Sequence, residues 1–280
     1  MFSLNGKVAI VTGGGSGIGR SISVMLAAQG ADVMVTGRDA GALAATAADI
    51  EAAGGWAFAM PLDITAPDAP RRIVEAAVAE FGRIDVLVNN AGGADPADAV
   101  PLLDVRDDQW DRVVDLNLKA NFFMAQAVAR QLRDQGMAES GARGGTIIQI
   151  SSRSGSQPNP MTGHYGAAKA GIENLVGTMA VEWGHLNIRV NAIAPGVVVT
   201  EANQDFMSGA RAQKQIDTIP LGRLGKAEDV AALCVFLASD EAEWISGTVI
   251  QATGGSRLPM GYLAYLHKIR KAAQGNGGDQ

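Results

Sequence analysis

The residues most suggestive of chemistry are a tyrosine and a lysine four positions apart, Tyr165 and Lys169. On a helix these positions share a face, so the lysine ammonium would lie beside the phenol. An isolated phenol, with a pKa of about 10, is a poor base at neutral pH, and a neighbouring positive charge lowers that pKa. We therefore expect the pair to exchange a proton with a carbonyl or alcohol oxygen. Taken alone, the spacing also fits an ordinary surface contact on a helix.

A second informative segment is the glycine-rich stretch at residues 12–19, TGGGSGIG, which follows an apolar run and precedes a helical pattern. Free N–H groups at the start of a helix bind anions such as a pyrophosphate. The spacing also nearly fits the phosphate loop of NTPases, except that Arg20 stands where that loop has a lysine. The missing lysine and the βα units that follow favour a dinucleotide. The expected cofactor contacts in this stretch are Gly13, Gly15, Ser16, Gly17, Ile18 and Gly19.

Alternating strands and helices must position these groups. Short apolar runs predict strands at 8–12, 32–36, 56–62, 86–89, 146–151, 189–194 and 248–251. Several of these runs are continuous, as is typical of strands covered on both faces. Segments of helical period lie near 18–29, 39–53, 67–81, 106–135, 163–184 and 227–238. The repeated alternation predicts an α/β fold, a doubly wound Rossmann-type parallel sheet with helices on both faces, in a single domain.

We expect residues 1–256 to form the dinucleotide-binding and catalytic domain, and residues 257–280 to form a C-terminal tail. Within the domain, the stretch 195–226 has no strand pattern after Pro195-Gly196. Long irregular segments in compact domains are often lids or binding loops. We therefore predict that 195–226 is a lid over the substrate.

Together these motifs resemble the short-chain dehydrogenase/reductase family. The matching pieces occur in family order over about residues 5 to 255: Thr12-Gly13-x3-Gly17-Ile18-Gly19, Asn89-Asn90-Ala91-Gly92, Asn117, Ser152, Tyr165-x3-Lys169 and Pro195-Gly196-x3-Thr200. The resemblance implies a seven-stranded sheet, a homo-oligomer (tetramer or dimer) and an NAD(P)-dependent enzyme that transfers hydride between the nicotinamide and a carbonyl or secondary alcohol. The implied catalytic set is Asn117, Ser152, Tyr165 and Lys169.

The resemblance also gives each member of this set a role. The Ser152 hydroxyl would hold and polarise the substrate oxygen beside the proton donor Tyr165. The side chain of the preceding Ser151 would point elsewhere, because side chains alternate along a strand. Asn117 would position a water in a proton relay to Lys169, which would also bond the nicotinamide ribose.

The end of the second strand bears on the choice of cofactor. An acidic residue at the position of Gly37 would bind the ribose 2′-hydroxyl and repel a 2′-phosphate. Gly37 removes that repulsion, and Arg38 offers a guanidinium to a phosphate. We therefore expect NADP(H), with NAD(H) the alternative. Further cofactor contacts implied by the resemblance are Asp63 and Ile64 at the adenine, Asn90, Ala91 and Gly92 at the adenosine ribose, and Pro195, Gly196, Val198 and Thr200 near the nicotinamide.

The substrate is a small carbonyl or alcohol compound whose identity the sequence does not define. The residues expected to contact it are Ser152, Ser154, Gln157, Met161 and His164. A second reading is a reductase of enoyl or dienoyl thioesters such as acyl-CoA, because the segment 244–250 and the tail resemble such enzymes. A third is a non-catalytic dinucleotide sensor, which would have no need of the four catalytic residues.

Composition argues against several other classes. A net charge of −6 gives no electrostatic case for nucleic-acid binding, and a single cysteine with three dispersed histidines gives no metal-ligand cluster. We find neither an apolar run of the ~18 residues that a membrane span needs nor a targeting segment, and we expect no membrane partner and a cytoplasmic location.

Overall fold

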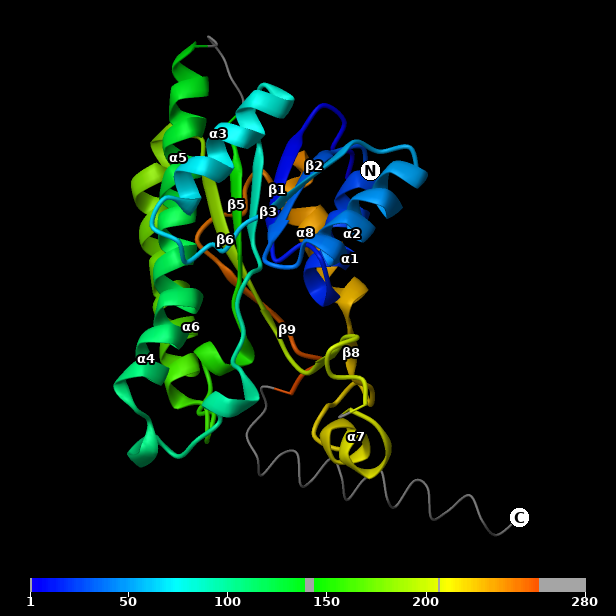
Figure 1. Ribbon diagram of the computed structural model, residues 1–280, viewed down its shortest axis with the longest axis vertical. Coiled ribbons are helices and arrows are strands. Elements are labelled where there is room, and N and C mark those ends of the chain that lie inside the picture. The colour runs from blue at the N-terminus through cyan, green and yellow to red at the C-terminus, as the bar shows by residue number, and fades with distance from the viewer. Residues whose placement is uncertain (1, 139–143, 206, 257–280) are drawn as a thin grey trace, which may run out of the picture.

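The computed structural model describes residues 2–138, 144–205 and 207–256, so the predicted tail, 257–280, lies outside the described residues. Seven strands of the described chain form one parallel sheet in the order β3-β2-β1-β4-β5-β6-β9 (Figure 1). β1 and β4 are adjacent, so the order reverses between them, as in doubly wound folds. The predicted fold is confirmed. The strands are β1 (Val8–Thr12), β2 (Asp32–Gly37), β3 (Ala57–Pro61), β4 (Val86–Asn89), β5 (Thr146–Ile150), β6 (Arg189–Pro195) and β9 (Val249–Ala252).

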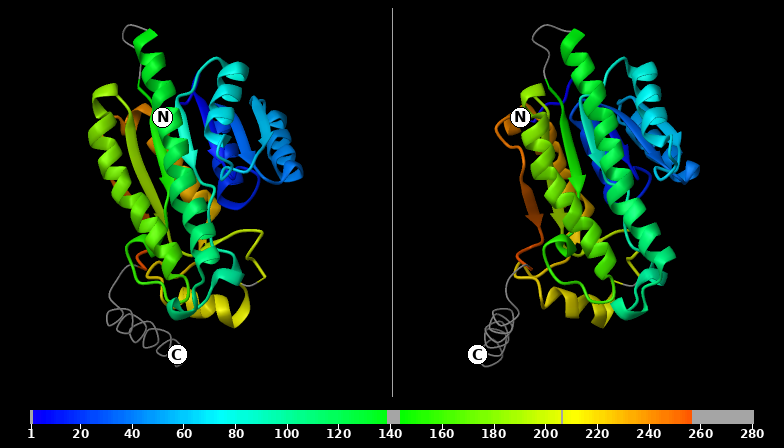
Figure 2. Two further views of the ribbon diagram at one scale, coloured as in Figure 1. Left: turned by 60° about the vertical axis from the view of Figure 1, so that its left-hand side comes forward. Right: turned by 90° about the vertical axis from the view of Figure 1, so that its left-hand side faces the viewer.

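Helices cover both faces of the sheet (Figure 2). One face carries α1 (Gly17–Ala28), α2 (Ala40–Ala52) and α8 (Ala227–Ala238). The other carries α3 (Ala69–Phe81), α5 (Ala120–Ala138) and α6 (Gly163–Trp183). Within β1, Ala9 and Val11 pack into the first layer and Ile10 into the second. Burial on both sides explains why the strands read as continuous apolar runs.

The predicted helix near 106–135 is confirmed as an unbroken helical run, but its register changes at a π-helical turn that the sequence did not predict. α4 (Asp107–Val114) leads into a π-helical turn, Asp115–Lys119, and then into α5. The Ala120 N–H donates to the carbonyl of Asp115, five residues earlier. Such widened turns are rare and occur mostly at functional sites. Residue propensity does not encode them, so this one could not be predicted from the sequence.

The segment 195–226 is more regular than predicted. It contains α7 (Gly209–Ile216), and β7 (Val198–Val199) pairs in parallel with β8 (Gly225–Lys226). The expectation of no strand after Pro195-Gly196 is therefore wrong, since strands of two residues leave no hydrophobic pattern. Because β7 follows β6 and β8 precedes α8, their pairing closes the segment into a loop beyond the carboxyl end of the sheet (Figure 1).

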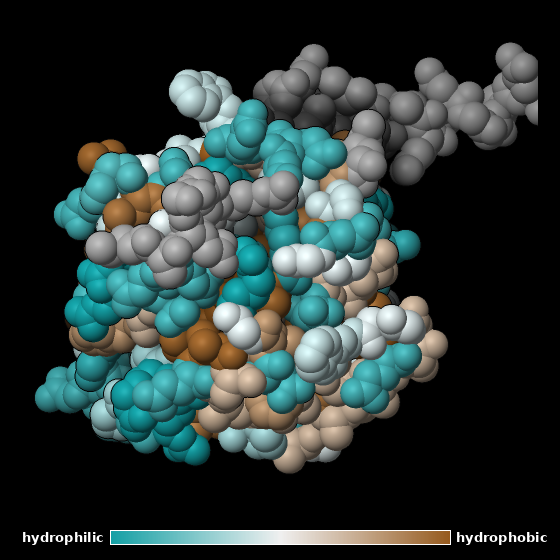
Figure 3. All heavy atoms as spheres, turned by 90° about the horizontal axis from the view of Figure 1, so that it is seen from above, coloured by the Kyte–Doolittle hydropathy of each residue, from teal (hydrophilic) through white to brown (hydrophobic). Residues whose placement is uncertain are grey.

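The opposite face, at the amino ends of the strands, mixes hydrophilic and apolar side chains (Figure 3). Of the described helices, none is long and apolar enough to cross a membrane.

Asp85, the residue directly before β4, links the start of that strand to Val8, the first residue of β1. Its carboxylate accepts hydrogen bonds from the Val8 N–H at 2.9 Å and from Arg83 Nε, also at 2.9 Å, while its own N–H donates to the Val8 carbonyl. Asp85 is buried, so removal of the carboxylate would leave a buried N–H without its partner.

We predict that Asp85→Ala lowers the free energy of unfolding by about 1–3 kcal/mol, the usual cost of a buried hydrogen-bonding group that loses its partner. Urea denaturation followed by circular dichroism measures the change. Asp108→Ala removes an equally close ion pair, with Arg106, in which both side chains are more than 60% exposed, and it should change stability little. Equal losses in the two variants would show that Asp85 does not hold the strands.

Candidate active site

A cleft of about 1090 Å³ opens at the carboxyl ends of the central strands. Parallel α/β sheets bind ligands at this edge, where the strand order reverses. The residues predicted to bind the cofactor all line this cleft: Gly13, Gly15, Ser16, Gly17, Ile18, Gly19, Arg38, Asp63, Ile64, Asn90, Ala91, Gly92, Tyr165, Lys169, Pro195, Gly196, Val198 and Thr200.

The turn between β1 and α1 tolerates only glycine at two of its positions. A Cβ at Gly19 would lie 2.0 Å from the Gly13 carbonyl oxygen, and a Cβ at Gly13, whose φ is +65°, would lie 2.9 Å from Asn90 Nδ2. The result is a bare backbone at the start of α1, which points free N–H groups into the cleft. The turn therefore fits the pyrophosphate of a dinucleotide.

Thr12 and Asn90 fasten this turn to the loop that follows β4. Thr12 Oγ1 accepts hydrogen bonds from the N–H groups of Asn90 and Ala91, both at 3.0 Å. In return, Asn90 Nδ2 donates to the carbonyls of Thr12 at 3.0 Å and Gly13 at 3.1 Å. The ends of β1 and β4 are thus held as one unit, which we call the Thr12–Asn90 clasp.

The first turns of α6 bring the predicted proton donor to the cleft. Tyr165 and Lys169 share one face of α6, with Lys169 Nζ 5.7 Å from the centre of the Tyr165 ring. Tyr165 lies near Ser152, the second residue after β5, whose side chain acts on the pKa of the phenol. Lys169 is buried and donates to the Ile150 carbonyl at 2.9 Å. The Ser151 hydroxyl instead donates to Glu173 at 2.8 Å, so it points elsewhere, as alternation along the strand predicts.

Asn117 lies on the π-helical turn and is held from three sides. Its Nδ2 donates to the carbonyls of Gly93 at 2.8 Å and Val113 at 3.0 Å, and its Oδ1 accepts from the Gly93 N–H at 2.8 Å. A Cβ at Gly92 would lie 2.7 Å from Asn117 Oδ1 and 3.1 Å from Lys169 Nζ. The amide and the ammonium therefore approach each other across Gly92, which has no side chain to separate them.

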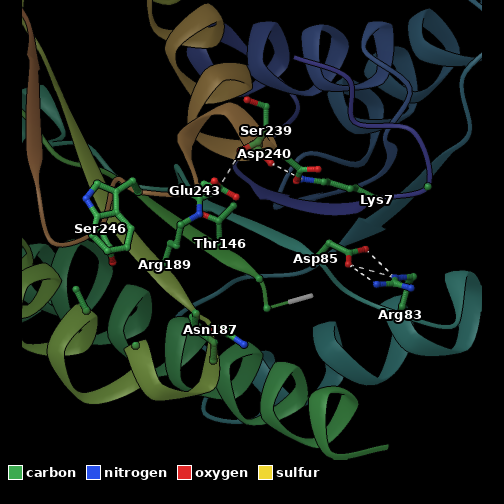
Figure 4. A pocket seen from close by; sticks show the side chains of 18 of the residues that line it. Lys7, Arg83, Asp85, Thr146, Asn187, Arg189, Ser239, Asp240, Glu243 and Ser246 are labelled. Atoms are coloured by element: carbon green, nitrogen blue, oxygen red, sulfur yellow. Dashed lines mark hydrogen bonds and ion pairs between the residues drawn. The ribbon is translucent and has the colours of Figure 1, made fainter. Parts of the chain in front are cut away.

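A second hollow of similar size, about 1110 Å³, lies at the amino ends of the strands (Figure 4). Its charged groups already have partners within the protein. Lys7 pairs with Asp240 at 2.8 Å, Arg83 pairs with Asp85, and Arg189 donates to the carbonyls of α8 and the residues after it. The groups that could perform chemistry gather in the first cleft, at the other end of the sheet.

Comparison with known proteins identifies the family. Residues 13–257 match a family model described as enoyl-(acyl carrier protein) reductase. The 7α-hydroxysteroid dehydrogenase of Escherichia coli K12 is 36% identical over 253 residues, which cover 90% of this chain and 94% of that protein. The chain belongs to the short-chain dehydrogenase/reductase family. It is an oxidoreductase that acts on CH–OH and C=O groups with a nicotinamide dinucleotide.

Solved structures of dehydrogenases agree with this fold. A 7α-hydroxysteroid dehydrogenase in complex with NADH and 7-oxo-glycochenodeoxycholic acid has a TM-score of 0.84 and 36% identity, and the match covers 91% of this chain and 95% of that one. A protein of Agrobacterium tumefaciens with bound NADP, assigned provisionally as a 2-deoxy-D-gluconate 3-dehydrogenase, has a TM-score of 0.81 and 36% identity, with 91% and 98% covered.

In this short-chain dehydrogenase/reductase, burial sets the proton affinities of the tyrosine and the lysine. Burial raises the pKa of Tyr165, and the hydrogen bond from Ser152 lowers it by less. Burial lowers the pKa of Lys169 to about 8, against an opposing effect of Glu173. The net shift is therefore opposite to the lowering that was predicted from the charge of Lys169. Desolvation of the phenol is the largest cause of this shift.

The predicted substrate contacts are more scattered than the cofactor contacts. Ser152 lines the cleft, whereas Ser154, Gln157, Met161 and His164 are not among the residues that line it. Ser154 is buried, Gln157 is half-buried, and Met161 is exposed with φ +73°. His164 is fully buried, and neither ring nitrogen has a hydrogen-bond partner in the described chain. Roles for these four residues stay predictions.

Among the residues that line the cleft and that sequence reasoning missed are Asp98, Arg112 and Asn203. Asp98 is buried and pairs with Arg112, fourteen residues later and on α4. Asn203 closes the turn after β7, where its side chain accepts from the Thr200 N–H at 2.9 Å and donates to the Val198 carbonyl at 3.0 Å. No periodicity or motif marked these positions. Within the described residues, no group of three or more His, Cys, Asp or Glu could hold a metal ion.

The lowered pKa of Lys169 predicts a specific pH dependence of stability. The unfolded lysine titrates near pH 10.5 and the buried one near pH 8. Below pH 8 both states carry the proton, and the folded protein bears the full cost of the buried charge. Between pH 8 and 10.5 the folded state releases its proton first, so this cost is progressively relieved.

At pH 7 the free energy of unfolding of Lys169→Met should therefore exceed that of wild type by about 3 kcal/mol, minus the cost of leaving the Ile150 carbonyl unpaired. This difference between variant and wild type should shrink as the pH rises from 8 to 10.5. Chemical denaturation at several pH values, without cofactor, measures this slope. Lys119→Met, which removes an exposed lysine, provides the control. A difference between Lys169→Met and wild type that is constant from pH 7 to 10.5 would contradict the lowered pKa.

Proposed function

We propose that Tyr165, Ser152, Lys169 and Asn117 are the catalytic residues with which this enzyme interconverts a carbonyl and a secondary alcohol. The observation that carries the proposal is that Tyr165 and Ser152 line the same glycine-lined cleft, with the Ser152 side chain near enough to lower the pKa of the phenol. Two hydroxyl groups placed in this way can both contact one substrate oxygen. Lys169 and Asn117 lie next to these hydroxyl groups and can pass a proton on from them through a water molecule.

A nicotinamide dinucleotide bound in the cleft supplies or accepts the hydride. Ser152 holds the substrate oxygen, and in reduction Tyr165 gives its proton to that oxygen. The raised pKa keeps Tyr165 protonated at neutral pH, so the proton that reduction requires is present. Lys169, with a pKa of about 8, can exchange protons near neutral pH and restore the phenol. Asn117 lies beside Lys169 and positions the water that carries the proton onward. Oxidation reverses these steps.

We expect Tyr165→Phe to lower kcat/KM by about 10²–10⁴, the usual contribution of a positioned general acid. Ser152→Ala should also lose activity, whereas Ser151→Ala should stay close to wild type because its hydroxyl binds Glu173. Oxidation of NADPH and NADH, followed at 340 nm against a panel of ketones and aldehydes, measures the rates. Undiminished activity in Tyr165→Phe, or equal losses in the two serine variants, would refute this assignment.

The cofactor is proposed to be NADP(H) rather than NAD(H). Gly37 and Arg38 both line the cleft at the end of β2, and Arg38 is exposed and available to a 2′-phosphate. Asp39 does not occupy this position, because its carboxylate caps α2 by accepting from the Ala42 N–H at 3.0 Å. The Asp39 carboxylate is thus already engaged by the first turn of α2.

Gly37→Asp should reverse the preference. A Cβ there would meet only ordinary contacts, 3.7 Å from Leu43 Cδ2, so the side chain fits without strain. The new carboxylate should raise the Kd of NADPH at least tenfold through repulsion of the 2′-phosphate and change the Kd of NADH little. Fluorescence titration measures both constants. If the variant weakens NADPH and NADH equally, the 2′-phosphate does not lie at this position.

A reductase of enoyl thioesters is the second candidate, and the description of the matching family model favours it. Carbonyl chemistry ranks first because Tyr165 and Ser152, which line the cleft together, suit an oxygen that gains or loses a proton. Adding enoyl and 3-oxoacyl thioesters to the substrate panel separates the two candidates.

We further propose that residues 1–256 act as one catalytic domain with 195–226 as its substrate lid, and that the chain forms a homo-oligomer. Large exposed apolar side chains on the helices and before β9 support association, among them Val181, 84% exposed, and Trp244, 97% exposed. We also propose a cytoplasmic location, because the single cysteine, Cys234, is buried and forms no disulfide, and disulfides are rare in cytosolic proteins.

A further inference from the structure

A glutamate from the lid segment reaches the place where the pyrophosphate of a dinucleotide belongs. Glu201 follows Thr200 just after β7, and its Oε2 accepts a hydrogen bond from the Gly17 N–H at 3.1 Å. Gly17 is the first residue of α1 and lines the cleft. The carboxylate therefore uses one of the N–H groups that the glycine turn offers to an anion.

Arg20 strengthens this contact from the next turn of α1. Its Nη1 lies 3.4 Å from Glu201 Oε1, while its Nε and Nη2 donate to Asp49 of α2 at 3.2 and 2.6 Å. Arg20 is the residue that stands in place of the phosphate-loop lysine. In this chain it links α1 and α2 to the lid segment.

The residues beside Glu201 pack against the glycine turn, although the Glu201 side chain itself is exposed. A Cβ at Gly17 would lie 3.1 Å from the methyl carbon of Thr200, so the backbone of the segment rests against the glycine turn. Asn203 closes the chain from Thr200 to Asn203 into a compact turn. Hydrogen bonds from its own backbone N–H and from Gly17, together with Arg20, hold the pKa of Glu201 below its usual value, so the carboxylate is charged at neutral pH.

A charged carboxylate and a pyrophosphate cannot share the same N–H group, and two anions at one helix start repel each other. We propose that Glu201 is a gate for the cofactor: it occupies the anion site of the free enzyme and must leave Gly17 when the dinucleotide binds. Entry of the cofactor is thereby coupled to movement of the 200–203 turn. Departure of the cofactor is assisted by return of the carboxylate. This inference rests on the proposed dinucleotide site.

The gate makes two predictions of opposite sign for Glu201→Gln and Glu201→Ala. The free protein should become slightly less stable, with a lower Tm, because a negative charge at a helix start is stabilising. The affinity for NADPH should nevertheless rise, with a Kd about three- to tenfold lower, because no carboxylate has to be displaced. Glu182→Gln, on an exposed part of α6, should change neither quantity.

Fluorescence titration with NADPH and NADH and thermal unfolding with and without NADPH provide the test on the full-length protein. A lower Tm of the free protein combined with a lower Kd supports the gate. A weaker or unchanged Kd in both variants overturns it and leaves Glu201 a structural tie for the lid. If wild type and variants alike bind neither dinucleotide, the proposed function fails and the gate fails with it.

Discussion

The hydrogen bonds between Thr12 and Asn90 are the constraint on which the site depends. They join the ends of two strands that are neighbours in the sheet but almost eighty residues apart in the chain. This clasp holds the glycine turn against the loop that carries Ala91 and Gly92. The turn itself is so close to its neighbours that a Cβ at Gly13 or Gly19 would clash. That loop in turn meets Asn117 and Lys169. A single pair of polar side chains thus fixes the position of the glycine turn relative to Asn117 and Lys169.

Burial, rather than direct charge pairing, controls the chemistry of the proton-transfer groups. Lys169 is enclosed so fully that its ammonium is costly, and Tyr165 is desolvated so that its phenolate is costly. Both shifts favour uncharged forms: the pKa of Lys169 falls to about 8, while that of Tyr165 rises above its usual value. Protonated Lys169 is therefore the stronger acid of the two and can return a proton to the Tyr165 phenolate.

Much of this arrangement is predictable from the sequence, for physical reasons. The seven strands leave apolar runs because both faces of the sheet are buried, and the glycine turn is recognisable because only glycine fits it. The residues proposed to contact the cofactor line the cleft, since many of them belong to those motifs. Three features were out of reach. The π-helical turn under Asn117 depends on a hydrogen-bond register rather than on residue preference, the two-residue strands of the lid have no periodicity, and Asp98 meets Arg112 only through tertiary packing. The direction of the Tyr165 pKa shift was predicted wrongly, because the four-residue spacing reveals that Lys169 is a neighbour but not that the phenol is desolvated.

The most direct test of the account is a crystal structure of the enzyme with NADPH and a bound ketone, or with an alcohol and NADP. The account predicts that the Tyr165 and Ser152 hydroxyls both lie within about 2.6–3.2 Å of the same substrate oxygen, on the side of the nicotinamide ring that faces α6. It is contradicted if the substrate oxygen contacts neither hydroxyl while the dinucleotide fills the glycine-lined cleft.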